Sequence, residues 1–146
     1  GTLFPYTTLF RSGVFERVNI YLVALEDAGQ QGELIGCDDS LIPVEVEIEP
    51  TEAPLEAALE ELLSLEGPDY GESGLYNALY RSDLTLQDVT IEDGRATVLL
   101  TGTIQLGGEC DIPRVEEQLR ATALQFDTVD EVTILVDGVP LDEALR

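Results

Sequence analysis

The residues best suited to chemistry in this chain are two cysteines, Cys37 and Cys110, each directly before an aspartate in the runs GCDD and GECD. They are the only cysteines among the 146 residues, and the chain has no histidine. One thiolate at each place supplies too few ligands for a zinc ribbon, and the wide spacing excludes a CxxC redox motif. Two alternatives remain: two buried reduced thiols, or one long-range disulfide, which the loop-entropy model values at about 4 kcal/mol.

The absence of histidine and lysine restricts the catalysis that the chain could perform. A Ser-His-Asp triad, a Cys-His pair and an imidazole metal site all need histidine, while a Schiff base and a phosphate-cradling P-loop need lysine. An enzyme would have to use carboxylates, tyrosine, hydroxyls and arginine, as glycosidases do. We therefore predict no catalytic residue, no cofactor and no metal site. A carboxylate-dependent glycan hydrolase is the alternative.

The charge of the chain is strongly negative, at −23, because 30 acidic residues face seven arginines. A field of this sign repels phosphate backbones and anionic lipid, so we predict no nucleic-acid binding and no direct membrane insertion by this domain. The acidic surface is either a solvated one or a loose binder of divalent cations. Asp38 and Asp39 could hold a cation, but nothing near them in the sequence supplies the roughly six oxygens that calcium needs.

Two further groups of polar side chains are candidates for a binding role. Asp111 and Arg114 lie three residues apart at a predicted helix start, where they could clamp a ligand or form a capping aspartate with a local ion pair. Three tyrosines, Tyr70, Tyr76 and Tyr80, gather around a glycine-rich break. They could offer apolar rings with polar tips to a carbohydrate or peptide, or pack into the core. We take them as a candidate partner surface, and we expect at least two of them to pack into the core.

The first twelve residues are not interpreted as part of the fold. The run TLFPYTTLFRS, Thr2 to Ser12, resembles the translation of a common sequencing-adapter oligonucleotide, and the chain contains no methionine. We therefore expect any signal peptide, lipid-anchor cysteine or transmembrane helix to lie upstream. The remaining residues 13–146 have the length of one domain, and a hydrophobic content of 44% is sufficient for a core.

The first half of this domain predicts two strands and a helix. Val18 to Leu25 is apolar in both alternating sets, as in a central strand covered on both faces, whereas Leu41 to Glu49 alternates as in a half-exposed strand. The following helix would have Thr51 as its cap and Pro54 in its first turn. Gly74 to Leu79 is predicted to form one short helical turn.

The second half predicts a hairpin, a helix and a final strand. Asp93-Gly94 joins the two strands of the hairpin, and Gly102 indicates a bend or bulge in the second of them. Asp111 is the predicted N-cap of a helix that runs to about Phe126. The element order predicts a single α+β two-layer sandwich, with two main helices over one mostly antiparallel mixed sheet. The predicted core consists of Val18, Ile20, Val46, Leu59, Leu62, Val98, Leu119, Phe126 and Ile134.

The order of several short runs carries a family resemblance. These runs are GCDDSLIPVEVEI, PLEAALEELL, GLYNAL, VTIEDGRATVLLTG and GGECDIPRVEEQLRATALQFDTVDEVTILVDGVPL. Together, over Val18 to Leu141, they resemble the sporulation and spore germination (GerMN) domain family. The run LLSLEGPDYGESG departs from that family's pattern, in which the break after the first helix is shorter.

The resemblance implies a non-catalytic, extracytoplasmic binding or assembly module of a bacterial envelope or sporulation protein, because the family has no assigned catalytic residues. The partner would be an envelope protein or a cell-wall polymer. The domain would be secreted, or anchored to a membrane through a missing N-terminal segment. In that compartment we expect Cys37 and Cys110 to be bonded, with their Cα atoms within about 7 Å of each other.

Overall fold

The computed structural model describes residues 13–146, so the interpretation of residues 1–12 as a translated adapter lies outside the described residues. The strands are β2 (Phe15–Ala24), β3 (Glu33–Leu34), β4 (Ser40–Thr51), β5 (Asp83–Glu92), β6 (Arg95–Thr103), β7 (Glu131–Val136) and β8 (Val139–Pro140). The helices are α2 (Pro54–Leu63), α3 (Asp111–Leu124), the short α4 (Leu141–Ala144) and the 3₁₀ turn η1 (Gly36–Asp38).

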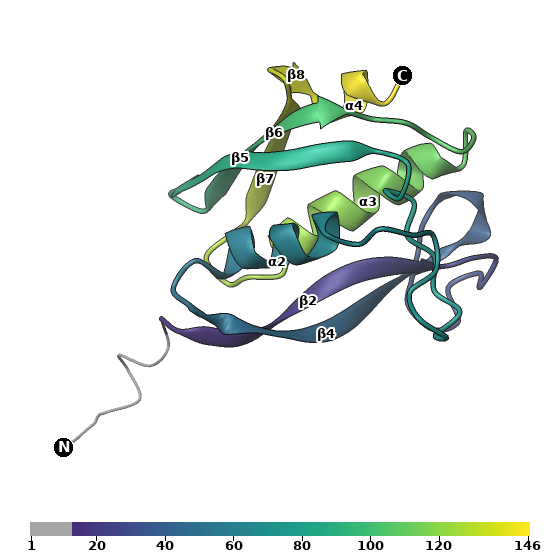
Figure 1. The fold of residues 1–146 in the computed structure, drawn as a ribbon, viewed down its shortest axis with the longest axis horizontal. Coiled ribbons are helices and arrows are strands. Elements are labelled where there is room, and N and C mark those ends of the chain that lie inside the picture. Colours follow the sequence, from purple (N-terminus) through teal and green to yellow (C-terminus); the bar gives the residue numbers. More distant parts are fainter. Residues whose placement is uncertain (1–12) are drawn as a thin grey trace.

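The strands form two sheets, and helices α2 and α3 lie between them (Figure 1). One sheet has the order β2-β4-β3 and the other has the order β5-β6-β7-β8. All strand pairings are antiparallel except that of β6 with β7. The predicted α+β sandwich with mostly antiparallel pairing is therefore confirmed. The expectation of one sheet is wrong, because the helices bury apolar faces on both of their sides and need a sheet on each.

Strand β4 has the predicted half-exposed pattern, with Val44, Val46 and Ile48 half-buried and the intervening glutamates exposed. Strand β2 is not the predicted central strand, because it lies at the edge of its sheet. The side-chain amide of Gln125, the residue directly after α3, covers part of that edge. The N–H of Asn19 donates to Oε1 of Gln125 at 2.9 Å, and Nε2 of Gln125 donates to the Asn19 carbonyl at 2.6 Å.

The hairpin of β5 and β6 turns at Asp93 and Gly94, as predicted. Both residues have positive φ, 51° and 82°, as a two-residue primed turn requires. The irregularity expected at Gly102 lies in the facing strand, between Leu86 and Asp88. Gly102 has another reason to be glycine: its φ is 126°, and an added Cβ would meet the Asp83 carbonyl oxygen at 1.9 Å.

The helix starts differ from the predicted caps. Helix α2 begins at Pro54, but its N-cap is Ala53, while Thr51 ends β4 and its hydroxyl accepts the Ala53 N–H at 3.0 Å. Helix α3 begins with Asp111 itself, so its N-cap is Cys110. Neither helix therefore has a side-chain hydrogen bond from its N-cap residue.

The predicted helical turn at Gly74 to Leu79 is wrong. Tyr76 lies in extended backbone and exchanges two hydrogen bonds with Val23, with its N–H donating at 2.8 Å and its carbonyl accepting at 2.9 Å. This segment is too short to form a stable helix by itself. It instead continues the covering of the β2 edge that Gln125 begins.

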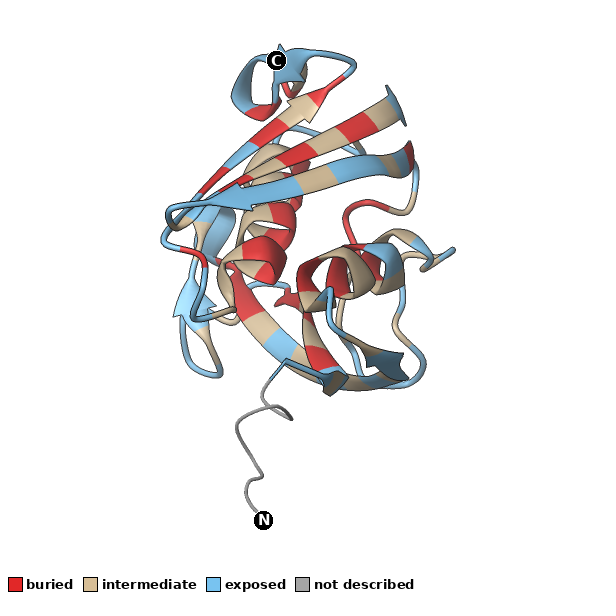
Figure 2. Ribbon diagram, turned by 90° about the vertical axis from the view of Figure 1, so that its left-hand side faces the viewer, coloured by how far each residue is buried: buried red, intermediate tan, exposed pale blue. Residues whose placement is uncertain are grey.

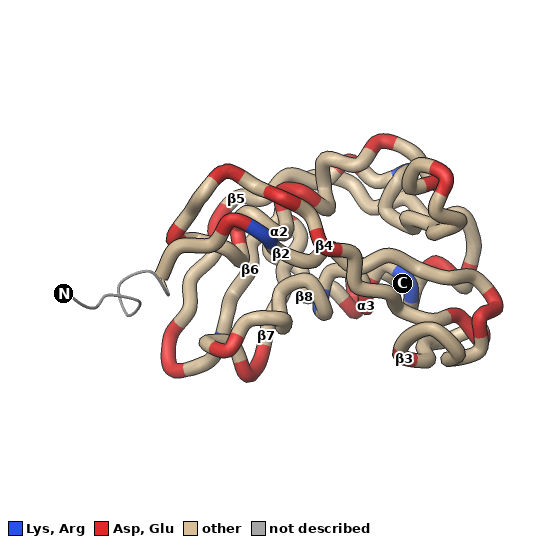
Figure 3. The backbone as a smooth tube through the Cα atoms, turned by 90° about the horizontal axis from the view of Figure 1, so that it is seen from below, with Lys and Arg blue, Asp and Glu red and all other residues tan. Residues whose placement is uncertain are grey.

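The core fills the space between the two sheets and around the helices, where the buried residues face one another (Figure 2). Seven of the nine predicted core residues are buried: Val18, Ile20, Leu59, Leu62, Val98, Leu119 and Ile134. The other two, Val46 and Phe126, are half-buried and pack against this core. Acidic residues recur along most of the described backbone (Figure 3).

Candidate functional site

Cys37 and Cys110 form a disulfide, as expected, with their Cα atoms 6.0 Å apart and their sulfurs at 2.02 Å. The bond joins η1 to the residue before α3 across a sequence separation of 73. The sequence holds no other cysteine, so this bond leaves no thiol for nucleophilic or metal-binding chemistry. The disulfide is therefore a structural link, which brings the loop of Asp38 and Asp39 to the start of α3.

Beside the disulfide, one arginine connects two buried carboxylates. Nε of Arg114 donates to Oδ2 of Asp39 at 2.6 Å, and its Nη1 donates to Oδ1 of Asp111 at 3.0 Å. The carboxylates of Asp39 and Asp111 are 0% and 2% exposed. The predicted ion pair between Asp111 and Arg114 is thus confirmed, and the structure adds Asp39, which sequence spacing did not reveal.

The remaining carboxylate oxygens of this pair are also occupied. Asp39 accepts the Glu26 N–H at 2.9 Å through Oδ1, and Asp111 accepts the Gly107 N–H at 2.7 Å through Oδ2. The hydroxyl of Tyr76 donates to Asp111, at 2.9 Å from Oδ1. We call Asp39, Tyr76, Asp111 and Arg114 the Arg114 cluster. Because every carboxylate oxygen in it has a donor, the cluster offers no free group for acid–base chemistry.

The Arg114 cluster raises the pKa of two of its own members. Burial opposes the charge of Arg114, but hydrogen bonds to Asp39 and Asp111 outweigh burial, so the pKa of the guanidinium is raised. Burial, together with the hydrogen bond to Asp111, raises the pKa of Tyr76 to about 12. Both shifts keep the cluster in one charge state, with protonated Arg114 and neutral Tyr76.

The structure brings two of the three predicted tyrosines together. The rings of Tyr76 and Tyr80 are 6.1 Å apart in an edge-to-face arrangement, and the guanidinium of Arg114 lies 5.4 Å from the Tyr76 ring. Tyr70 is half-buried and packs against the core. Tyr76 is therefore engaged by Asp111 and Arg114 within the protein. Of the predicted partner surface, this leaves the half-buried rings of Tyr70 and Tyr80.

Two buried amides near these tyrosines were not predicted. Gln118 is fully buried, where its Nε2 donates to the Tyr21 carbonyl at 2.9 Å and its Oε1 accepts the Ala78 N–H at 2.9 Å. Asn77 also accepts from Gln118, at 3.2 Å. The available signal was a glutamine beside Leu119 on the apolar stripe of α3, where an unsolvated amide must find partners.

Asp27 and Asp39, in the segment between β2 and β4, are bonded by side chains of the protein. Asp27 accepts from the side chain of Gln31 at 2.7 Å and from the hydroxyl of Ser40 at 2.7 Å, and the bonds from Gln31 hold its pKa below the ordinary value. Asp38 is exposed, whereas Asp39 faces Arg114. Among residues 13–146, no group of three or more acidic or cysteine side chains is arranged to hold a metal ion.

The opposite end of the molecule has a groove of about 700 Å³, which we call the end groove. It lies between the start of β2, the start of α2, the second half of β5 and the residues that follow α3. Its apolar lining comes from Phe15, Pro54, Leu55, Val89, Ile91 and Phe126. Three acidic residues, Glu52, Glu56 and Asp127, also line it, and no basic residue does.

The end groove also explains the position of Gln125 and Phe126. The ring of Phe126 meets that of Phe15 edge-to-face at 5.9 Å, so it closes one side of the groove instead of entering the core fully. Gln125 fixes this helix end by hydrogen bonds to Asn19 on the edge of β2.

Within the described part of the chain, no helix is long and apolar enough to cross a membrane.

Comparison with known proteins gives a fold and a family. The structure is similar to the first GerMN domain of the sporulation protein GerM from Bacillus subtilis, with a TM-score of 0.63, 19% identity and 89% of each chain covered. It is also similar to the tandem GerMN domains of that protein, with a TM-score of 0.59 and 20% identity over 84% of this chain and 39% of the other. At these identities the likeness shows a shared fold.

The sequence itself decides the family. No curated protein sequence matches the chain. A family model described as sporulation and spore germination matches residues 19–142, nearly the whole described domain. This agrees with the resemblance carried by the order of the short runs. The chain therefore belongs to the sporulation and spore germination (Germane) family.

Proposed function

We propose that this domain is a non-catalytic binding or assembly module that works outside the bacterial cytoplasm. The observation that carries the proposal is the complete satisfaction of the Arg114 cluster. It holds the deeply buried carboxylates of the described chain, Asp39 and Asp111, and each of their oxygens is engaged by a donor of the protein. A catalytic carboxylate must instead have a face open to substrate.

The extracytoplasmic location is supported by the disulfide and by the family. A disulfide that closes a long loop persists in an oxidising compartment and is rare in a reducing cytosol. The family description refers to sporulation and spore germination. We propose an envelope protein or a cell-wall polymer as the partner, and an anchor or secretion signal upstream. The charge of −23 favours such a partner over nucleic acid.

One observation favours a second function, that of a glycan hydrolase. The end groove has an open volume and carries Glu52, Glu56 and Asp127, and two carboxylates on either side of a glycan are the minimum that hydrolysis needs. However, Glu52 and Asp127 are exposed at the rim, and the lining is otherwise mostly apolar. A general acid needs a carboxyl held in apolar surroundings, so this arrangement suits binding better than proton transfer.

The test of the proposed function measures binding and turnover in the same sample. The protein is incubated with purified bacterial cell-wall glycan, and both the protein that sediments with the glycan and the release of reducing ends are measured. A second arm tests retention of solubilised envelope proteins on the immobilised domain. We expect binding in one of these arms and no reducing-end release. Turnover that Glu52→Gln or Asp127→Asn abolishes would establish the hydrolase instead.

The predicted tyrosine surface enters the same experiment. Tyr70→Ala and Tyr80→Ala remove half-buried rings but none of the hydrogen bonds of the Arg114 cluster, although Tyr80→Ala also removes the ring that packs against Tyr76. Tyr76→Ala would remove part of the cluster itself. If this surface binds the partner, the first two variants weaken retention while the protein stays folded. Unchanged retention would show that the tyrosines do not form the partner surface.

A further inference from the structure

We propose that the free edge of β5, together with the end groove, receives an extended segment of another protein in which apolar residues alternate with lysine or arginine. This inference rests on the proposed binding function and gives it a place and a partner chemistry. Three features of the same end of the molecule support it: an unpaired strand edge, an apolar groove directly below that edge, and acidic side chains around both.

The edge of β5 is open near the hairpin turn. β5 is the outermost strand of its sheet, and among the described residues no hydrogen bond from another segment reaches the backbone of Val89 or Ile91. In a two-residue hairpin the pair next to the turn, Glu92 and Arg95, exchanges backbone bonds. Alternation along the ladder then points the N–H and C=O groups of Val89 and Ile91 away from β6, toward an added strand.

Two other strand edges are protected. The edge of β2 is covered by bonds from Gln125 to Asn19 and from Tyr76 to Val23. On β4, the stretch beyond the short β3 contains Pro43, which has no N–H to donate, and exposed glutamates. Edge proline and edge charge are known ways to prevent strand addition. The end of β5 lacks a proline and carries the exposed apolar side chain of Ile91, which is 43% exposed.

The end groove lies where the inward-facing side chains of an added strand would point. Val89 and Ile91 belong to the face of β5 that looks toward α2, and both line the groove. A strand added beside them would direct alternate side chains toward the same face, over the rings of Phe15 and Phe126. Apolar side chains at these positions would be removed from water, which favours binding.

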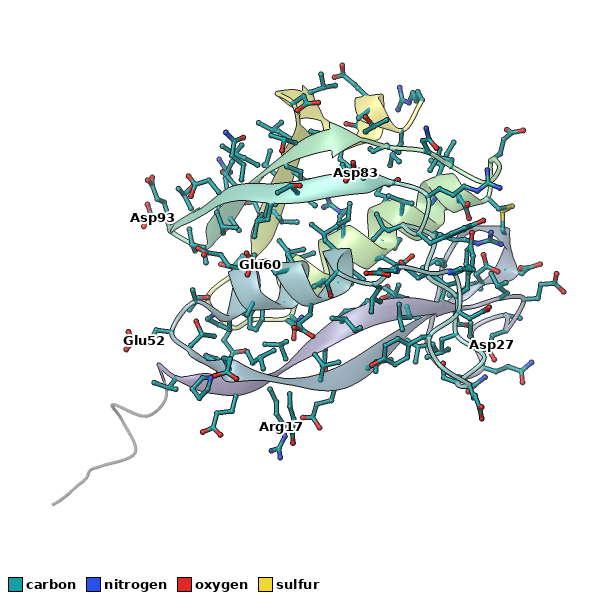
Figure 4. All side chains as sticks on the ribbon, in the orientation of Figure 1. Arg17, Asp27, Glu52, Glu60, Asp83 and Asp93 are labelled. Atoms are coloured by element: carbon teal, nitrogen blue, oxygen red, sulfur yellow. A yellow bond between two sulfur atoms is a disulfide. The ribbon has the colours of Figure 1, made fainter. Side chains whose placement is uncertain are left out.

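The charges at this end specify a basic partner. Asp88 and Glu92 lie on the solvent face of β5, where they would be cross-strand neighbours of the outward residues of the added strand. Glu52 and Asp127 stand at the groove rim, and Figure 4 shows Glu52 at the same end as Asp93 of the turn. A second copy of this chain is a poor occupant, because it has no lysine and the same charge of −23.

The test uses a ten-residue peptide of alternating valine and lysine, the length of β5, with both ends blocked. Its control has the same composition, with the valines and lysines in two separate blocks. Binding is measured by calorimetry at physiological salt, where exposed charges beyond about 8 Å are screened. We expect the alternating peptide to bind about tenfold more tightly than its control. Equal affinity would overturn the proposal, because binding would then be non-specific attraction.

Two protein variants locate the binding site. Ile91→Lys places a charge on the free edge, and Leu34→Lys makes the same kind of change on β3 at the other end, where Leu34 is 57% exposed. We expect Ile91→Lys to lower the affinity for the alternating peptide about tenfold and Leu34→Lys to leave it unchanged. An equal loss in both variants would contradict the assignment to β5.

Amide hydrogen exchange gives a direct measure of strand addition. On binding, the outward N–H groups of Val89 and Ile91 should become protected, whereas that of Thr90, already paired with β6, should not change. Protection confined to residues 66–80 would overturn the proposal in favour of the tyrosine surface. If Ile91→Lys still retains the native partner as well as wild type, the site on β5 is wrong while the binding function stands. Glycan turnover would contradict the binding function itself.

Discussion

The two ends of this sandwich differ in whether their exposed or buried groups find partners within the protein. At one end the Arg114 cluster and the disulfide hold buried polar groups, and at the other the end groove leaves apolar side chains and a strand edge exposed. The disulfide in Figure 4 lies near the end marked by Asp27, away from Glu52 and Asp93. The first end satisfies its polar atoms internally, whereas the second leaves groups without partners among residues 13–146.

This difference indicates that stability and binding are located apart in the domain. Two carboxylates can be buried beside the disulfide because Arg114, Tyr76 and two backbone N–H groups are fixed around them. At the groove end, β5 is the outermost strand of its sheet and Ile91 is solvent-exposed. Changes at the first end should therefore unfold the domain, while changes at the second should affect association.

The largest effect is expected from removing the disulfide. In the double variant Cys37→Ser, Cys110→Ser the unfolded chain regains the freedom of a long loop, so the free energy of unfolding should fall by about 4 kcal/mol. Urea denaturation of the variant and of the oxidised wild type measures the difference. Reduced wild type is the control and should match the variant. A difference below about 1 kcal/mol would show that the bond contributes little to holding this end.

Removing the positive charge that Arg114 supplies to Asp39 and Asp111 should have the next largest effect. Arg114→Met leaves Asp39 and Asp111 buried without their ion-pair partner, which should lower the free energy of unfolding by about 3 kcal/mol. Arg120→Met, on the same helix, is the matched control and should change it by less than about 0.5 kcal/mol. Thermal and urea denaturation measure both. Equal stabilities would mean that the Arg114 cluster does not stabilise its end of the sandwich.

Tyr76→Phe should have a smaller effect that depends on pH. The variant loses the bond to Asp111, worth about 1 kcal/mol at neutral pH. The pKa of Tyr76 is raised from 10.0 to about 12 in the folded protein, so the folded state holds this proton more tightly than the unfolded state. The resulting stability is complete below pH 10 and is lost as the pH rises to about 12.

Unfolding free energies measured between pH 8 and pH 12 would test this. Wild type should lose part of its stability over that interval, and Tyr76→Phe should lose less, while Tyr70→Phe, outside the cluster, should follow wild type. Parallel curves for wild type and Tyr76→Phe would contradict a role for this hydroxyl in the cluster.

The smallest effect on stability is expected at the groove end. Ile91→Lys replaces an exposed side chain at the free edge, so its free energy of unfolding should stay within about 0.5 kcal/mol of wild type. Leu34→Lys should behave in the same way. Urea denaturation of both variants measures this. A large loss in Ile91→Lys alone would show that the groove end also holds the fold together, and the contrast between the two ends would fail.

The sequence by itself determined those features that depend on neighbours along the chain. Asp93-Gly94 specified the hairpin turn, because only residues that tolerate positive φ fit there. Pro54 marked the start of α2, since its ring fits the first helical position. The count of two cysteines left few alternatives to a single bond, and the order of the short runs identified the family.

Only the tertiary structure decided which elements meet. Asp39 reaches Arg114 from far along the chain, and Gln125 completes the edge of β2, although no local pattern predicts either partner. The division into two sheets could not be predicted from the sequence. Alternation shows that a strand has a buried face, but it does not show which helix covers that face. The physical reason is range: turn and helix-start preferences act between adjacent residues, whereas sheet order and buried polar pairs depend on faces that the chain brings together only when it folds.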